Sequence, residues 1–443
     1  MSRRSSMESI SEYSSQQISY GSDNLMEWDE RILSTELVEP KTKKLGMDKP
    51  FLLISLVLLL IGVIMVFSAS FARAHYTAQG PLFLFTRQTI FAVSGVAIMF
   101  VTSWLNVRIL SRWSMPILLV SIAMLVMVLL VGNTVNGATR WIGIGAGDNS
   151  IFTFQPSEIA KLAVVLAFAQ IACKLGTAKM KTFKFGVLPF AVIGGTIIVL
   201  LRFQPHLSAI IIITAITAIM MFAGGTGVKW FVIAVAILTS MIVGFIFFQL
   251  RTAAPEVDVR DVNMQTIRYI DFHSMGYEGR RIGAWLNPDA DPLGAGLQAR
   301  QSLNAVGSGG LLGLGLGQSR QKYMYLPEEH NDFIFAIVAE ELGFIGAMLI
   351  LMLFALLVVR GFWLALHAND KFSTLITIGL TSLLAIQVFL NIGVVLNILP
   401  ATGISLPFFS YGGTALWLQM AQVGIILSVS RNIPVPEEAG KKA

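Results

Sequence analysis

The sequence predicts an all-α polytopic membrane protein with ten transmembrane helices and a large extracytoplasmic loop between helices 7 and 8. Three observations predict this fold class. Of the 443 residues, 55% are hydrophobic and only 13% are charged, whereas about 25% of the residues in soluble domains are charged. Most of the chain falls into charge-poor runs that are long enough to cross roughly 30 Å of bilayer hydrocarbon. One segment, 251–331, is by contrast rich in charge.

The individual helices follow from these runs. Prolines and glycines between residues 399 and 413 divide the last uncharged run, 372–430, into two helices. The predicted spans are 51–72, 88–107, 113–139, 156–173, 185–201, 207–228, 230–250, 332–359 and the two halves of 372–430.

Basic residues predict the orientation of the helices. With the N-terminus inside, the short inner loops carry more Lys and Arg than the short outer loops. The positive-inside rule therefore predicts that both termini are cytoplasmic. Residues 1–49 have no apolar core and are predicted to be a disordered cytoplasmic tail. The ten-helix membrane domain then covers 50–430, and 431–443 is a cytoplasmic C-terminal tail.

The charge and cysteine content exclude several classes of protein. The net charge of +6 is spread along the chain, whereas a nucleic-acid-binding protein gathers its basic residues on one face. We therefore expect no nucleic-acid partner. The single cysteine cannot form an intrachain disulfide or a cysteine-rich metal site.

Charged residues at membrane depth are costly, so each one is a candidate for function. Glu158 and Lys161 are three positions apart and share a helix face, where they could bind a substrate or simply neutralise each other. Asp332 and Glu340 open the eighth span, where a direct role and anchoring at the interface are both open. Arg202 in a short outer loop could bind an anion or could extend to water.

The charged segment 251–331 is the predicted site of most of the extracytoplasmic chemistry, because structureless loops of this length are usually functional. Its 285–296 stretch combines prolines and glycines with two carboxylates, Asp289 and Asp291. The glycine-rich run 307–317 does not fit a dinucleotide-binding motif. Close backbone packing or a flexible lid explains it better.

Several short strings occur in one order over residues 50–430. They are G-A-T-R-W-I at 137–142, F-Q-P-S-E-I-A-K at 154–161, D-P-L-G-A-G at 291–296, Y-L-P-E at 325–328, D-F-I-F-A at 332–336, E-E-L-G at 340–343, L-P-A-T-G at 399–403 and S-Y-G-G at 410–413. Together they resemble the SEDS family (shape, elongation, division and sporulation). The string G-L-G-Q-S at 315–319 is more similar to its cell-division branch than to its elongation branch.

The resemblance implies a peptidoglycan glycosyltransferase of the cytoplasmic (inner) membrane. Such an enzyme polymerises lipid II at the outer face and releases undecaprenyl pyrophosphate. Asp291 aligns with the catalytic aspartate of the family, which implies that it is the general base. Without the resemblance, Asp291 is better explained as a side chain that stabilises its own turn.

The diphosphate leaving group needs cations around it. By position, the candidates for binding it are Arg140, Lys161, Arg202, Arg280 and Arg281, with Glu158 orienting Lys161. His330, Asp332 and Glu340 are candidates for supporting roles on the outer face. We also expect a divalent cation, Mg²⁺ or Mn²⁺, held by few carboxylates and the substrate phosphates. The identity of its ligands is not predicted, and no organic cofactor is expected.

The resemblance also implies partners. These are a class B penicillin-binding protein that acts as the transpeptidase, other division proteins at the septum, and membrane lipids. Three alternatives stay open: a lipid II flippase or transporter, a non-catalytic division scaffold, and an elongation-type polymerase. A transporter should tolerate Asp291→Asn, whereas a glycosyltransferase should not.

Overall fold

The computed structural model describes residues 42–76, 82–135, 138–144, 152–233, 256–260, 266–270, 276–288 and 296–436, together with positions 236, 240 and 294. The chain divides into two compact units. One contains Gly46–Ile433, and the other contains Met1–Leu45 with Pro434–Ala443. In the smaller unit, strand β1 (Thr42–Lys44) pairs in antiparallel fashion with β7 (Pro434–Pro436).

The larger unit is a bundle of helices, which confirms the all-α polytopic fold class. Among the described residues, nine stretches are long and apolar enough to cross a membrane. They are formed by α2 (Lys49–Tyr76), α3 (Phe83–Trp104), α4 (Val107–Val131), α5 (Pro156–Met180), α6 (Phe183–Gly186) with α7 (Leu188–Phe203), α8 (Leu207–Gly224), α12 (Ile334–Leu366), α13 (Lys371–Val395) and α14 (Gly413–Ser430).

Nine of the ten predicted spans correspond to these helices. Only the start of the remaining span, 230–250, lies within the continuously described residues, where 228–233 are helical. The count of ten therefore stays a prediction. The predicted N-terminal tail up to residue 41 also lies outside the described residues.

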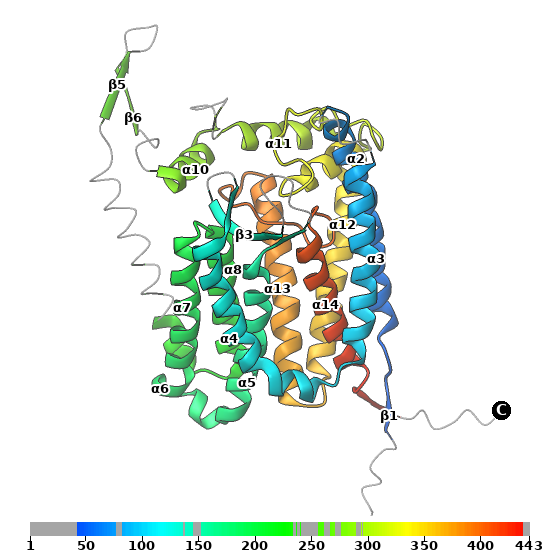
Figure 1. The fold of residues 1–443 in the computed structure, drawn as a ribbon, viewed down its shortest axis with the longest axis vertical. Coiled ribbons are helices and arrows are strands. Elements are labelled where there is room, and N and C mark those ends of the chain that lie inside the picture. Colours follow the sequence, from blue (N-terminus) through cyan, green and yellow to red (C-terminus); the bar gives the residue numbers. More distant parts are fainter. Residues whose placement is uncertain are drawn as a thin grey trace, which may run out of the picture. The chain divides into compact units, whose positions relative to one another are not determined.

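Helices α5, α13 and α14 are the most buried of the spanning helices, and they form the centre of the bundle. Figure 1 shows α3 running along α14 and α4 running along α5, in agreement with their contacts. Helix α5 begins at Pro156, which suits the first helical position because proline lacks the N–H that would be unpaired there.

The predicted span 113–139 is wrong at its C-terminal end, because α4 stops at Val131. Gly132 leaves the helical conformation, and residues 133–135 and 138–139 of the uncharged run form strands. Strands β2 (Asn133–Val135), β3 (Ala138–Ile144) and β4 (Phe152–Phe154) make a small antiparallel sheet. A charge-free run cannot distinguish a helix from a helix followed by a hairpin. The consequence for function is that Arg140 lies on a strand.

The described parts of the charged segment 251–331 contain strands and helices. Strands β5 (Glu256–Arg260) and β6 (Thr266–Ile270) pair with each other, and helices α10 (Gly276–Leu286) and α11 (Leu297–Ser308) follow. The indole of Trp285 on α10 donates to the carbonyl of Asn397 at 3.0 Å, and the hydroxyl of Ser302 on α11 donates to the carbonyl of Val395 at 2.7 Å. Both helices are therefore attached at or just after the C-terminal end of α13, and Figure 1 shows α11 lying across that end.

Helix α12 is broken at Gly343, whose φ of 68° and ψ of −172° are not helical. The glycine-rich run pairs with the backbone groups exposed by this break. Leu314 and Gly315 donate to the carbonyls of Glu340 and Glu341 at 3.0 Å each. The N–H groups of Phe344 and Ile345 donate in turn to carbonyls of the run. Close packing, and not a free lid, is therefore the observed role of residues 310–315.

A buried carboxylate joins three helices at the opposite end of the bundle. Asp48 accepts from Arg360 on α12 at 2.6 and 3.2 Å, and it also caps α2 by accepting from the N–H of Phe51 at 2.9 Å. Its own N–H donates to the hydroxyl of Ser430 on α14. By the predicted topology this is the cytoplasmic end.

Candidate functional site

A cavity of about 890 Å³ lies where four helices begin. Its lining includes Gln155, His206, Phe333 and Gly412, which immediately precede α5, α8, α12 and α14. The N-terminus of a helix carries a partial positive charge and unpaired N–H groups, so it favours anions. Four such termini around one cavity predispose it to bind a negatively charged ligand.

In the part of the chain that the structure describes, four Arg and Lys side chains line the same cavity. They come from different elements and are Arg87 on α3, Arg140 on β3, Lys161 on α5 and Arg281 on α10. The carbonyls of Gln204 and Pro205 accept from Arg140, and the carbonyl of Ala401 accepts from Arg281 at 2.6 Å. These contacts fix the guanidinium groups, because each one is attached to backbone on a second segment.

Lys161 and Glu158 form a buried ion pair with 2.7 Å between Nζ and Oε1. Both side chains are less than 10% exposed and line the cavity. The predicted pairing of the two charges is therefore present in the structure, and both residues line the cavity. Glu158 holds the Lys161 ammonium in place, and the remaining N–H donors of that ammonium can serve a ligand.

Two carboxylates that line the cavity, Glu328 and Asp332, lie on the segment that leads into α12. Burial and the nearby Glu328 raise the pKa of Asp332 to about 6, although Arg281, Arg140 and His330 act in the opposite direction. Asp332 therefore titrates near neutral pH. The imidazole of His330 packs against the ring of Tyr411, with 5.8 Å between the centroids.

The cavity also contains buried polar groups that have no hydrogen-bond partner among the described residues. They include Nδ1 of His206 and the side-chain oxygen Oδ1 of Asn331. Burial, together with Arg140 and Lys161, lowers the pKa of His206 well below its ordinary value. His206 is therefore neutral at physiological pH, and its ring can donate or accept a hydrogen bond.

The structure brings together six of the residues selected from sequence. Arg140, Glu158, Lys161, Arg281, His330 and Asp332 all line the cavity. Asp291 lies outside the described residues, and of Arg280 only the backbone, on α10, is described.

Two other candidates do not line the cavity. Arg202 is exposed on the last turn of α7, whereas Gln204 and His206, which follow it, are buried. We therefore withdraw Arg202 from the candidate diphosphate site. Glu340 is fully buried on α12 and accepts hydrogen bonds from the loop that contains Ser319. Its side chain bonds that loop and Ser308 on α11, and it does not line the cavity.

Sequence reasoning did not select Arg87, Gln155, Glu328 and Tyr411, all of which line the cavity. A signal existed for Glu328, since it belongs to the Y-L-P-E string. Arg87 is a single cation shortly before an apolar run, and nothing in the sequence relates it to Arg140 or Lys161. The packing of α3 against α14 brings it to the cavity.

The described residues contain no group of three or more His, Cys, Asp or Glu side chains that could hold a metal ion. Glu328 and Asp332 could contribute one or two oxygen ligands. A divalent cation at this cavity would therefore take its other ligands from phosphates and water, which is common for Mg²⁺.

The fold and the cavity define a polytopic membrane protein with a cation-lined cavity at one end of its helical bundle. The cell cycle protein family of FtsW, RodA and SpoVE matches residues 49–434. The chain therefore belongs to this family, which confirms the predicted SEDS resemblance.

Curated relatives cover nearly the whole chain. Stage V sporulation protein E of Bacillus subtilis is 40% identical over 88% of this chain and 98% of its own length. The protein of Trichlorobacter lovleyi named "Probable peptidoglycan glycosyltransferase FtsW" is 36% identical over 89% of this chain and 96% of its own length. A Bacillus subtilis protein with the same name is 33% identical.

Solved structures agree with the fold. A chain from a peptidoglycan synthase complex, described as coordinating polymerization and crosslinking, matches with a TM-score of 0.68 and 26% identity. The match covers 87% of this chain and 98% of that chain. RodA of Thermus thermophilus matches with a TM-score of 0.60 and 24% identity, which supports the fold alone.

Proposed function

We propose that this chain is a peptidoglycan glycosyltransferase that polymerises lipid II at the outer face of the cytoplasmic membrane during cell division. The predicted enzyme class is confirmed by the relatives named peptidoglycan glycosyltransferase. Their name, FtsW, also supports the division branch, although the relative at 40% identity is a sporulation protein. The observation that carries the proposal for this chain is the convergence of four cations on one cavity.

The cavity is suited to the diphosphate of the donor. Arg87, Arg140, Lys161 and Arg281 come from four separate elements, so they can surround an anion. Negative charge grows on the leaving diphosphate as the glycosidic bond forms, and fixed cations stabilise that charge best when they are already in place. The apolar surfaces between helices are suited to the lipid tails.

The reaction needs one general base. The acceptor sugar hydroxyl attacks the anomeric carbon of the donor, the bond from that carbon to the diphosphate oxygen breaks, and the hydroxyl proton passes to a carboxylate. By family resemblance that carboxylate is Asp291. Among the described residues, Glu328 and Asp332 are the carboxylates beside His330 on the cavity wall, and they could orient the acceptor.

Further parts of the proposal come from the sequence and from the family. A bound Mg²⁺ or Mn²⁺ would add positive charge at the diphosphate. A class B penicillin-binding protein would supply crosslinking, and other division proteins would recruit the chain to the septum. Both termini would lie in the cytoplasm, because the basic loops favour that side.

The test is polymerisation of fluorescent lipid II by the purified full-length chain with a class B partner and Mg²⁺ or Mn²⁺. Wild type is compared with Asp291→Asn and with Asp289→Asn, a matched control two positions away, at equal folded amounts. We expect wild type and Asp289→Asn to form glycan chains, and we expect Asp291→Asn to form none.

Each other outcome rejects part of the proposal. Equal polymerisation by Asp291→Asn would show that this carboxylate is not the base. If wild type forms no glycan but moves lipid II across liposome membranes, the chain is a transporter and the enzyme proposal fails.

A further inference from the structure

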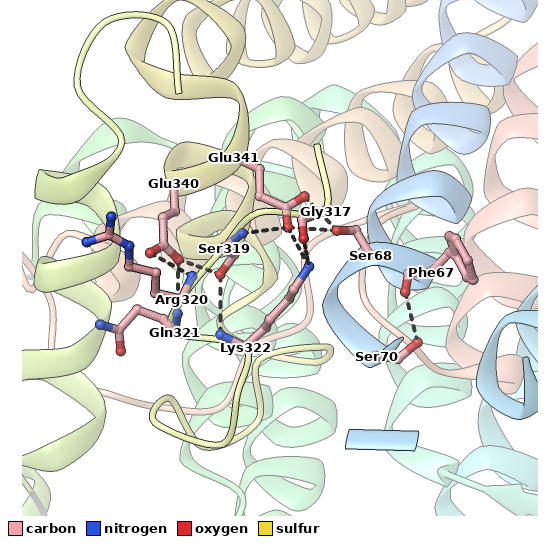
Figure 2. Close-up of polar contacts among 10 residues, drawn as sticks. All are labelled: Phe67, Ser68, Ser70, Gly317, Ser319, Arg320, Gln321, Lys322, Glu340 and Glu341. Carbon is pink, nitrogen blue, oxygen red and sulfur yellow. Dashed lines mark hydrogen bonds and ion pairs between the residues drawn. The ribbon is translucent and has the colours of Figure 1, made fainter. Parts of the chain in front are cut away.

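We propose that a buried loop clamp, made of Ser68, Ser319, Lys322, Glu340 and Glu341, positions the carboxylate-bearing wall of the cavity for the reaction. None of these five residues lines the cavity, so they would be positioning residues and not catalytic residues. The inference rests on the proposed polymerase activity. Figure 2 shows the clamp, with both glutamates reaching from α12 toward the loop that holds Ser319 and Lys322.

Glu340 binds the loop at several points. Its carboxylate accepts from the hydroxyl of Ser319 at 2.5 Å and from the backbone N–H groups of Arg320 and Gln321 at 3.1 and 3.3 Å. It also accepts from the hydroxyl of Ser308 on α11 at 3.2 Å. Because a carboxylate can accept about four hydrogen bonds, Glu340 is fully engaged in holding the loop.

Glu341 binds the same loop through a charge. Its Oε1 lies 3.1 Å from Nζ of Lys322, and both side chains are almost completely buried. The ammonium of Lys322 also donates to the carbonyl of Gly317 at 2.6 Å. The hydroxyl of Ser68 on α2 donates to Glu341 at 2.6 to 2.7 Å. The clamp therefore joins α2, the loop and α12.

The clamp holds both ends of the stretch from Lys322 to Glu340, and the middle of this stretch forms part of the cavity wall. The chain leaves the clamp at Lys322 and returns to it at Glu340. Between these points it supplies six cavity-lining residues, Pro327, Glu328, His330, Asn331, Asp332 and Phe333. Holding both ends of this stretch on α12 restricts where Glu328, His330 and Asp332 can lie.

Loss of the clamp should affect turnover more than binding. The four cations belong to α3, β3, α5 and α10, so none of them lies on the clamped stretch. Misplacement of reacting groups by about 1 Å can cost about 100-fold in rate. We therefore expect kcat to fall while KM for lipid II changes little.

The experiment compares Lys322→Met with the double variant Lys322→Met/Glu341→Gln in lipid II polymerisation. The single variant leaves the buried Glu341 charge unpaired, whereas the double variant removes both charges and keeps groups that can bond Ser68 and Ser319. Per folded molecule, we expect kcat to fall at least about tenfold in the single variant. We expect KM within about twofold to threefold of wild type, and recovery of most of kcat in the double variant.

Arg360→Met is the matched control. It breaks another ion pair of α12, that of the part-exposed Arg360 with the buried Asp48 at the other end of the bundle. It should lower the thermal midpoint and leave kcat per folded molecule unchanged. An equal loss of kcat in Arg360→Met would overturn the proposal, because activity would then simply follow stability.

Wild-type kcat in Lys322→Met, or no recovery in the double variant, would also overturn the proposal. If Lys322→Met does not fold, Ser319→Ala tests the same clamp through Glu340. A fall of about threefold or more in kcat supports it, and an unchanged kcat rejects it. If wild type itself forms no glycan, the proposed function fails, and this result is distinct from failure of the clamp.

Discussion

Asp332 experiences opposing influences at the scale of single residues. Burial and Glu328 favour its neutral form, and Arg281, Arg140 and His330 favour its charged form. Burial and Glu328 outweigh the three positive groups, so the pKa of Asp332 is about 6, above its ordinary value of 3.8. A raised native pKa means that the native state binds this proton more tightly than the unfolded state does. The proton on Asp332 stabilises the folded state fully below the pKa that Asp332 has in the unfolded state. This stabilisation is lost as the pH rises through about 6.

Asp332→Asn should therefore change stability in a pH-dependent way. The amide carries no charge at any pH, so at about pH 8 the variant avoids the cost of a buried carboxylate. We expect its thermal midpoint in detergent to exceed that of wild type by roughly 2–5 °C at about pH 8. At about pH 4 the two proteins should unfold at similar temperatures. A difference that is the same at both pH values would contradict the assigned pKa.

The sequence identifies which types of residue line the cavity better than it identifies which individual side chains face it. Arg140 and Arg202 are both single arginines in predicted outer loops, yet only Arg140 lines the cavity. The difference arises because α4 ends early and β3 carries Arg140 to the cavity, whereas Arg202 lies on the exposed side of α7. Neither the early end of α4 nor the rotation of α7 is encoded in hydropathy.

At the scale of elements, the break in α12 depends on two glycines. Gly343 has a φ and ψ that only glycine adopts readily. A Cβ at Gly343 would lie 2.2 Å from the backbone nitrogen of Gly313, and a Cβ at Gly313 would lie 2.1 Å from the carbonyl oxygen of Glu341. The glycine-rich loop can therefore approach α12 only without side chains at these points.

We expect Gly343→Ala to lower the stability of the membrane domain. The backbone strain alone costs about 1–3 kcal/mol, and the steric clash adds to it. Gly195→Ala on α7 is the matched control, because a Cβ there meets nothing within 4 Å and the position is helical. Thermal midpoints and folded yields in detergent measure both variants. Equal midpoints for the two would show that the tight approach is not needed.

Charge-free length predicts most of the spanning helices because hydrocarbon excludes charge regardless of tertiary contacts. It does not predict the sheet of β2, β3 and β4, or the break at Gly343, because neither changes the hydropathy of the run. Charge-free length also does not predict the pairing of residues 310–315 with α12, because backbone hydrogen bonds leave no pattern in the side chains.

At the scale of the whole molecule, the two ends of the bundle differ in chemistry. One end holds the cavity with its helix N-termini and cations. The other end holds the ion pair of Asp48 with Arg360, and exposed lysines that include Lys184. The predicted topology places the first end outside and the second in the cytoplasm.

Thiol labelling tests this orientation. In a Cys173→Ser background, a cysteine is placed at Leu312 or at Lys184, both of which are exposed. A membrane-impermeant maleimide should label Leu312→Cys in intact cells or spheroplasts, and it should label Lys184→Cys only after permeabilisation. The reverse pattern would place the cavity in the cytoplasm and would contradict an extracytoplasmic polymerase.

The central claim is that the cavity cations bind the donor diphosphate. The most direct measurement is steady-state lipid II polymerisation by Arg140→Gln and Arg202→Gln at equal folded amounts. Arg140 lines the cavity, and Arg202 is an exposed arginine outside its lining. Loss of a charged contact costs about 1.5–3 kcal/mol, so kcat/KM should fall at least about tenfold in Arg140→Gln and stay within about twofold of wild type in Arg202→Gln. Equal values of kcat/KM for the two variants would contradict the claim.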